Sequence, residues 1–318
     1  MAVPRRSSSK KIDVAVIGLG NWGTSLAAGL NAARIPLPEI VVRAPARRTR
    51  LRKALSNAKS VVPWRDAILD ARILWICVPD AAIAEVAENI AKKRPDLRGQ
   101  IVVHSSGALT AGVLNPVRLA GAGVASVHPV MTFPGKDVVP LPGMLFGVES
   151  SHAETRRRLN SLLRKLGGRP FFLTAEKKAL YHAAGTLASP LLVSELAAAM
   201  ETARLAGLGA RTAALWVKAL AEATARNVFA RGPGSSFSGP FARGDAATIR
   251  LHLQALDAHP ILADVYRSLA RNALSTLPVR NSHLLDEILN DGGVGKPNLS
   301  QNAEKHGRRG ARVRDLTA

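Results

Sequence analysis

Short apolar runs alternate with segments of helical periodicity up to about residue 174 of this 318-residue chain. Runs rich in Val, Ile and Leu predict strands at 12–17, 39–43, 72–78, 100–104, 123–127, 144–148 and 170–173. Apolar positions spaced three or four residues apart predict helices between them, at 22–33, 46–58, 80–93, 108–120 and 152–166. This alternation favours a parallel sheet with helices on both faces.

From Ala175 onward the pattern is helical only. Helices are predicted at 176–207, 210–229, 245–257 and 260–277, interrupted by a loop rich in Gly, Ser and Pro at 231–240. We therefore predict an α/β domain over 12–174 and an all-α C-terminal domain over 175–290. The polar, basic ends at 1–11 and 291–318 are predicted to be disordered.

The first apolar run leads directly into Gly18-Leu19-Gly20-Asn21-Trp22-Gly23 and an alanine-rich helix pattern. In such a strand–turn–helix unit the first glycine permits the tight turn and the second lets the backbone approach a pyrophosphate. The third lets the helix pack on its strand. The helix N-terminus, with Asn21 and Trp22, offers amide groups to the phosphates. The sequence thus predicts a dinucleotide-binding domain of Rossmann type.

The end of the second predicted strand distinguishes NAD from NADP. An NAD site usually has an acidic residue there, whereas this chain has Arg43, Arg47 and Arg48. A guanidinium can pair with a 2′-phosphate through two hydrogen bonds, and Arg43 is best placed because it ends the strand. The alternative is that Arg47 and Arg48 only begin a surface helix. We predict NADP in preference to NAD, bound by Arg43 and Arg47.

A second part of the cofactor site is predicted after the strand at 72–78, where Val78-Pro79-Asp80 leaves the sheet. Cofactors bind at the carboxyl edge of open α/β sheets, so Val78 and Pro79 are expected to line the site. Asp80 is expected to cap the following helix. Cys77 lies in an apolar run and is expected to be an inert buried thiol.

Two further strand ends carry candidate substrate-binding residues. Ser105 and Ser106 follow the strand at 100–104 and offer hydroxyl donors near the nicotinamide; the alternative for each is a helix cap. His128 follows the next strand and could bind substrate or transfer a proton, although a lone histidine is more often structural.

The strongest catalytic candidates lie on a helix. Lys178, His182, Thr186 and Ser189 are spaced by four, four and three residues, which places them on one helix face. A solvated polar face is the simpler explanation, but the apolar continuation through 191–199 indicates a buried central helix. There, Lys178 would polarise a carbonyl, His182 would supply a proton, and Ser189 would contact substrate.

Arg243 lies in the turn Ser238-Gly239-Pro240-Phe241-Ala242-Arg243-Gly244-Asp245 and is a candidate clamp for a substrate carboxylate. Asp245 is expected to cap the next helix, which would hold the arginine in place.

These motifs together resemble one bacterial family, whose members join a Rossmann-like domain to a domain called DUF2520. The resemblance covers residues 12–290. It depends on the glycine turn and on five further motifs in the same order, namely Val78-Pro79-Asp80, His104-Ser105-Ser106-Gly107, His128-Pro129, Tyr181-His182-Ala183-Ala184, and Gly239-Pro240 with Arg243-Gly244-Asp245. It implies an NADP-dependent oxidoreductase without naming the reaction.

A more distant similarity is to the 6-phosphogluconate and β-hydroxyacid dehydrogenases, ketopantoate reductase and pyrroline-5-carboxylate reductase. Many of these carry a catalytic lysine followed four residues later by asparagine, which correspond here to Lys178 and His182. The DUF2520 family usually has asparagine where this chain has Pro190, which should also kink the helix. The resemblance implies a homodimer formed through the helical domain.

Composition narrows the remaining possibilities. Residues 1–11 and 305–318 each contribute +4 to the formal net charge of +21, which leaves +13 on the rest of the chain. Such a charge attracts anionic cofactors and substrates. Nucleic acid is not the expected partner, because no zinc-ligand spacing or RNP-type motif accompanies the charge. A single cysteine and the lack of an uninterrupted apolar run of about 20 residues favour a cytoplasmic protein without a membrane span, and no metal is expected.

The leading hypothesis is therefore an NADP-dependent oxidoreductase. It would transfer hydride between the nicotinamide and a small anionic oxo or imino substrate bound between the two domains. The alternative is an NADP-binding sensor or regulatory protein without turnover.

Overall fold

The computed structural model describes residues 12–43, 58–133, 135 and 137–290. Contacts divide the chain into two compact units, Met1–Leu191 and Leu192–Ala318. The boundary predicted after residue 174 falls before helix α6, which the contacts place in the first unit. The predictions for 1–11, for 46–57 including Arg47, and for 291–318 lie outside the described residues.

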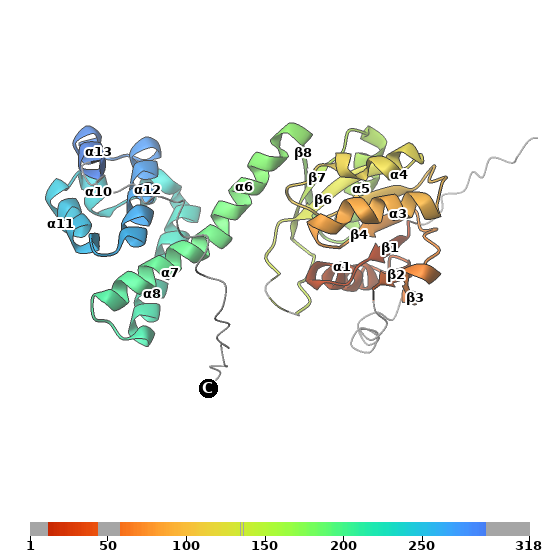
Figure 1. Ribbon diagram of the computed structural model, residues 1–318, viewed down its shortest axis with the longest axis horizontal. Helices are drawn as coiled ribbons and strands as arrows, with labels where there is room; N and C mark the ends of the chain where they lie inside the picture. The colour runs from red at the N-terminus through yellow and green to blue at the C-terminus, as the bar shows by residue number, and fades with distance from the viewer. Residues whose placement is uncertain (1–11, 44–57, 134, 136, 291–318) are drawn as a thin grey trace, which may run out of the picture. The chain divides into compact units, whose positions relative to one another are not determined.

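The first unit is built on a single sheet in the order β3-β2-β1-β4-β5-β6-β7-β8 (Figure 1). The strands are β1 (Val14–Ile17), β2 (Leu37–Val42), β3 (Ala58–Pro63), β4 (Ile73–Ile76), β5 (Ile101–His104), β6 (Gly123–Pro129), β7 (Leu145–Glu149) and β8 (Arg169–Leu173). All neighbouring strands are parallel except β6 and β7. The strand order reverses between β1 and β4, the position where open α/β sheets bind their ligands.

Helices cover both faces of this sheet, as predicted. They are α1 (Asn21–Ala32), α3 (Ile83–Lys93), α4 (Asn115–Leu119) and α5 (Ala153–Lys165), with 3-10 turns η2 (Trp64–Asp66), η3 (Asp80–Ala82), η4 (Ala111–Leu114) and η5 (Ala175–Lys177). Leu26 of α1 and Leu159 of α5 pack into the core on one face. Ile83 of α3 and Val117 of α4 pack into the core on the other.

All seven predicted strands are present, and the structure adds β3. Residue 58 is the only described position of the helix predicted at 46–58, and it is the first residue of β3, so that prediction is wrong at this position. The sequence Ala58-Lys59-Ser60-Val61-Val62-Pro63 has only two strongly apolar residues, which is why the strand gave a weak signal. Pairing with β2 along most of its length makes it a strand nonetheless.

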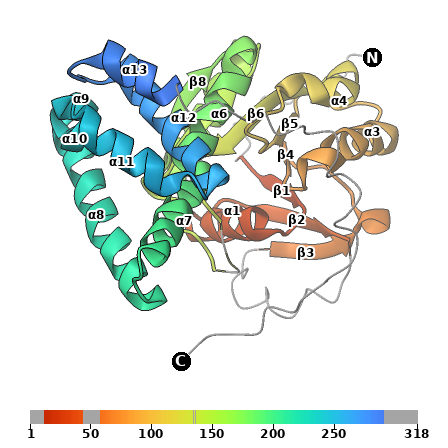
Figure 2. The ribbon, with the colours of Figure 1, turned by 60° about the vertical axis from the view of Figure 1, so that its left-hand side comes forward.

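The rest of the described chain is helical: α6 (Lys178–Ala188), α7 (Pro190–Leu205), α8 (Ala210–Arg231), α9 (Pro233–Ser236), α10 (Gly239–Arg243), α11 (Ala246–Leu256), α12 (Pro260–Thr276) and α13 (Ser282–Asn290). In the second unit, α11, α12 and α13 enclose a small core around Ile249, Leu253 and Leu285 (Figure 2). Helix α13 was not predicted from the hydrophobic pattern; its short span follows the turn at Asn281. The kink expected at Pro190 is confirmed, because the helix breaks at Ser189.

The prediction that the helix at 176–207 is buried is wrong for the single chain. Lys178 is the only buried residue of α6, and Leu180, Leu187 and Val193 are exposed by 65–70%. By length and a mean hydropathy of 1.4, the stretch Ala175–Leu205 could cross a membrane. However, the break at Ser189 divides it, and Lys178 is anchored in the first unit. Apolar periodicity shows that one face of a helix is suited to burial, but it does not show which surface packs against that face.

Candidate functional site

The glycine turn after β1 has the geometry that a dinucleotide requires. Gly18 has a φ of +99°, and a Cβ there would lie 2.6 Å from the Cys77 carbonyl oxygen. A Cβ on Gly23 would collide with the Gly18 carbonyl oxygen. Gly20 differs from both, because a Cβ on it would meet nothing within 4 Å. Gly18 and Gly23 are thus required by the fold, whereas Gly20 keeps a space open at the N-terminus of α1.

Of the other predicted cofactor residues, Asn21 and Trp22 belong to this turn and Val78 contacts it. Val78 lies against it, with its Cγ1 3.1 Å from the position of a Cβ on Gly18, and Pro79 follows. The Asn21 side-chain amide donates one of its two hydrogens to the Phe133 carbonyl (2.9 Å). The Trp22 ring packs against Phe133, which leaves only the backbone of Trp22 for a phosphate. Burial raises the pKa of the Cys77 thiol well above its usual range, consistent with an inert thiol.

Ser105 is held by two tryptophans at the end of β5. Its hydroxyl oxygen accepts hydrogen bonds from the indole nitrogens of Trp22 (2.7 Å) and Trp75 (2.8 Å). The two indole rings meet edge to face, with centroids 6.2 Å apart. The Ser105 side chain is only partly buried.

Ser106, in contrast, has no hydrogen-bonding capacity left for a substrate. Its hydroxyl donates to the Asp80 carboxylate (2.6 Å) and accepts from the backbone amides of Ala108 and Leu109. The Ser106 side chain therefore closes its own turn. It is not the helix cap given above as the alternative, because the next helical turn, η4, has Thr110 as its N-cap. The expectation that Asp80 caps a helix is wrong, because no side chain caps η3 or α3 and the Asp80 carboxylate instead receives Ser106.

Lys178 is fully buried at the start of α6. Its ammonium group donates to the carbonyl oxygen of Ser106 (3.0 Å) and to the hydroxyl of Ser126 (2.7 Å), and Ser126 donates in turn to the same carbonyl (3.0 Å). Burial lowers the pKa of Lys178 to about 8, although the nearby charges of Glu149 and Asp80 favour the protonated form. The lysine thus fastens α6 to the loop between β5 and η4.

His104, the last residue of β5, forms hydrogen bonds with the same loop. Its Nδ1 accepts from the Ser106 amide (3.2 Å) and its Nε2 lies 3.1 Å from the Thr110 carbonyl oxygen. Because a carbonyl can only accept, the ring is neutral with its proton on Nε2. Burial lowers the pKa of His104 to about 4, which keeps the ring neutral.

A second cluster, of three rings, meets the loop at Gly107. His128 Nδ1 lies 2.7 Å from the Tyr181 hydroxyl, and the His128 and His182 rings meet edge to face with centroids 5.8 Å apart. A Cβ on Gly107 would collide with Nδ1 of His182, so only glycine permits this approach. Burial, followed by the charge of Lys178, lowers the pKa of His128 to about 4, and burial raises the pKa of Tyr181. This cluster can hold and transfer a proton.

The structure brings some of the predicted residues together but not others. Ser105, His128, Lys178 and His182 converge on residues 105–107. Thr186 donates only to the His182 carbonyl, and Ser189 lies at the break between α6 and α7. Of the four residues in the predicted polar stripe, only Lys178 and His182 therefore belong to the site.

Both of the predicted arginines that the structure describes, Arg43 and Arg243, are exposed. Arg43 is exposed directly after β2. Arg243 belongs to the second unit, where its exposed guanidinium lies 4.0 Å from Asp245. Asp245 caps α11 as predicted, accepting from the Thr248 amide (3.1 Å).

Sequence reasoning missed three members of the site, namely Tyr181, Ser126 and Gly107. Tyr181 and Gly107 stand within motifs that carry the family resemblance, so their positions could have been singled out. Ser126 is an ordinary strand serine, and only the approach of Lys178 gives it a role.

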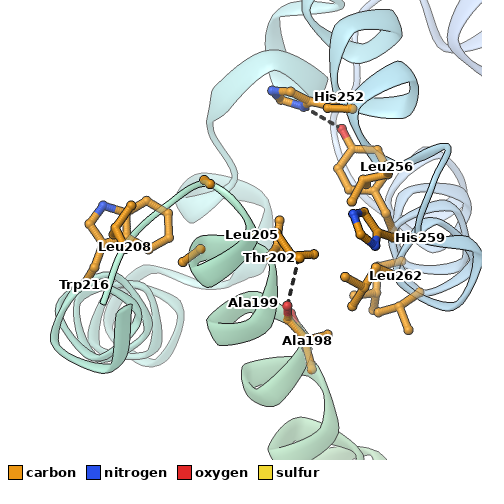
Figure 3. Close-up of a pocket in the computed structure, with 17 residues that line it drawn as sticks. Ala198, Ala199, Thr202, Leu205, Leu208, Trp216, His252, Leu256, His259 and Leu262 are labelled. Carbon is orange, nitrogen blue, oxygen red and sulfur yellow. Dashed lines mark hydrogen bonds between the residues drawn. The ribbon is translucent and has the colours of Figure 1, made fainter. Parts of the chain in front are cut away.

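The second unit has a groove of about 770 Å³ beside α7, lined mainly by apolar side chains such as Ala199, Leu256 and Leu262. Figure 3 shows His252 on one side of it, hydrogen-bonded to the Tyr266 hydroxyl (2.9 Å). Burial raises the pKa of Tyr266 to about 12.

Comparison with protein families identifies both parts of the chain. Residues 2–129 match the Rossmann-like domain, and residues 144–273 match DUF2520, a domain of unknown function. The chain is a Rossmann-like and DUF2520 domain-containing protein. No curated protein matches it.

Solved structures share this fold at low sequence identity. A Bacteroides fragilis protein named as a proposed NADP oxidoreductase is 21% identical, with a TM-score of 0.66 over 82% of this chain and 97% of that one. An imine reductase from Myxococcus stipitatus in complex with NADP+ is 15% identical (TM-score 0.63, covering 86% and 98%). A reductive aminase from Aspergillus terreus in complex with NADPH and ethyl levulinate is 17% identical (TM-score 0.59, covering 87% and 99%). These similarities confirm the predicted fold class.

Replacing Lys178 should remove a pH dependence of stability. With a folded-state pKa of about 8 against an ordinary 10.5, folded Lys178 has released a proton that the unfolded chain still binds between these pH values. The free energy of unfolding of the wild type should therefore rise by about 3 kcal/mol relative to Lys178→Met from pH 8 to 10.5, and stay parallel to it below pH 8. Urea unfolding at several pH values measures this difference.

Lys177→Met is the matched control, because the adjacent Lys177 is exposed. It should follow the wild type throughout. A difference between wild type and Lys178→Met that is constant from pH 7 to 10.5 would contradict the buried, perturbed ammonium.

Proposed function

We propose that this protein is an NADP-dependent oxidoreductase that acts on a small anionic oxo or imino compound. The observation that carries the proposal is the open space at Gly20, in a turn whose Trp22 indole donates to Ser105, two residues before Gly107 and its ionisable rings. The glycine turn and the N-terminus of α1 would hold the pyrophosphate. Bound NADPH would supply the hydride.

The preference for NADP is supported by the end of β2. No acidic residue follows this strand, and Arg43 is exposed there with a guanidinium that suits a 2′-phosphate. The imine reductase and the reductive aminase with this fold were crystallised with NADP+ and NADPH, respectively.

The proton that accompanies hydride transfer is best assigned to His182 or Tyr181. Nδ1 of His182 is buried without a hydrogen-bond partner among the described residues, so Nε2 is the nitrogen that can serve a ligand. The Tyr181 hydroxyl contacts His128, which can pass a proton to it. Lys178 is fully buried on two protein oxygen atoms, so we assign it to positioning the loop rather than to polarising a carbonyl.

An anionic substrate is supported by the charge of the chain, with Arg243 as the candidate carboxylate ligand. We further propose a homodimer formed through the helical region. Large apolar side chains of α7 and α8 are exposed in the single chain, including Val193 (66%), Trp216 (52%) and Leu220 (52%). Such faces usually mark interfaces.

Filling the space at Gly20 should weaken cofactor binding without unfolding the protein. Gly20 is the N-cap of α1, with a φ of −71° that any residue can adopt. Gly20→Val should weaken NADPH binding by about tenfold or more, because the side chain occupies the place of the pyrophosphate. Fluorescence titration with NADPH measures the affinity.

The matched control is Gly209→Val, which changes the N-cap glycine of α8, also without neighbours within 4 Å. Both variants should lose about 1 kcal/mol of capping or less, but only the first should lose NADPH. Gly20→Val should also lose the oxidation of NADPH that the wild type shows with a panel of 2-oxo acids and imines. If the wild type binds NADPH tightly but no compound oxidises the NADPH, the alternative hypothesis of a non-catalytic NADP-binding sensor would be favoured.

Removing the Arg43 guanidinium should reduce the discrimination between the two cofactors. Arg43→Ala should lower the ratio of NADPH to NADH affinity by about tenfold, since a charge-assisted pair with the 2′-phosphate is lost. Arg118→Ala removes an exposed arginine from α4 and should leave the ratio unchanged. An unchanged ratio in Arg43→Ala would exclude this arginine from cofactor selection.

A charge on α7 should dissociate the proposed dimer. Val193→Glu should raise the dimer dissociation constant by about tenfold or more, because it buries an unpaired carboxylate at the interface. Leu119→Glu provides the control, since Leu119 is 74% exposed on α4 in the first unit. Sedimentation velocity over a concentration series measures the dimer dissociation constant of each variant. A wild type that is monomeric throughout would refute the proposal.

A further inference from the structure

The Ser105 hydroxyl lies in an unusual hydrogen-bonding environment. Its oxygen accepts from the Trp22 indole at 2.7 Å and from the Trp75 indole at 2.8 Å. Trp75 is 0% exposed in β4, and Trp22 belongs to the glycine turn at the start of α1. Two rigid rings from two different elements therefore fix one serine.

This environment determines the direction of any further hydrogen bond. An indole nitrogen can only donate, and a hydroxyl oxygen has two lone pairs and one proton. The two indoles occupy both lone pairs of Ser105, so the hydroxyl has only its proton left to offer. Among the described residues, no group accepts that proton, and the side chain is partly exposed.

The location of Ser105 connects this donor to the cofactor site. Ser105 follows β5 at the carboxyl edge of the sheet, and its partner Trp22 lies within the glycine turn itself. A dinucleotide held by that turn continues along the same edge. The group that meets Ser105 is thus part of the bound cofactor or of a molecule beside it.

We propose that Ser105 is an obligate hydrogen-bond donor that selects a carbonyl-type oxygen on the ligand and rejects a protonated imine nitrogen at that point. The inference rests on the proposed function. The oxygen belongs either to the carboxamide of the nicotinamide or to an oxo acid bound beside it. A site built as a donor discriminates strongly against a ligand that brings a second donor, because one of the two polar groups is then left unpaired.

The hydrogen-bond arrangement itself can be tested by NMR. The chain has four tryptophans, of which Trp22 and Trp75 donate to Ser105, while Trp64 and Trp216 serve as internal controls. Ser105→Ala should shift the indole ¹⁵N–¹H signals of the first pair and leave those of the second pair unchanged. Unshifted signals of Trp22 and Trp75 would overturn the proposal.

Binding measurements distinguish the two sources of the oxygen. If the oxygen is the carboxamide, Ser105→Ala should weaken NADP+ by about tenfold and weaken thionicotinamide-NADP+ much less, because sulfur is a poor acceptor. If it belongs to an oxo acid, NADP+ should bind equally to both proteins, while oxamate should bind about tenfold more weakly to the NADP+ complex of the variant. Ser105→Thr, which keeps the hydroxyl, should remain within about twofold of the wild type in either case.

The remaining outcomes are also decisive. Equal binding of NADP+ and of oxamate by wild type and Ser105→Ala would overturn the proposal and leave Ser105 a structural acceptor for two indoles. Should Ser105→Ala fail to fold with two unmatched indoles, Ser105→Cys replaces it, since a thiol is a weak donor. A wild type that does not bind NADP+ would instead refute the proposed function.

Discussion

The hydrogen bonds of the buried Lys178 ammonium are the constraint on which the candidate site depends. They join the first turn of α6 to the Ser106 carbonyl after β5 and to Ser126 in β6. Burying an ammonium costs several kcal/mol, and only good hydrogen bonds and nearby negative charge offset that cost. Ser106, Ser126 and the field of Asp80 and Glu149 provide this offset. Where α6 begins, and how it is rotated, follow from this contact.

The rotation of α6 in turn decides which side chains reach the cofactor edge. Tyr181 and His182 follow Lys178 by three and four residues, so they lie about one helical turn further along the same side. There they contact His128 and Gly107. One helix therefore carries a buried lysine bound to two protein oxygen atoms and, one turn further on, two half-buried groups that can exchange protons. This separation explains why the lysine is unsuited to direct contact with a substrate.

The features that depend on local pattern could be predicted from the sequence. The seven strands, the glycine turn and the break at Pro190 follow from periodicity and from the conformational limits of glycine and proline. The partners of Ser105 could not be predicted, because Trp22 and Trp75 lie 83 and 30 residues away and meet it only through the strand order. The exposure of α6 escaped prediction for a related reason, since an apolar face does not specify what covers it.

The loop at residues 105–107 shows that residue type alone does not determine the role of a side chain. Ser105 and Ser106 are chemically identical neighbours, yet the fold occupies both acceptor sites of the first and every site of the second. Gly107 contributes only the absence of a side chain, which lets His182 approach. Three consecutive small residues therefore have three different structural roles. Which hydrogen-bonding sites the structure leaves vacant decides what each of them can offer a ligand.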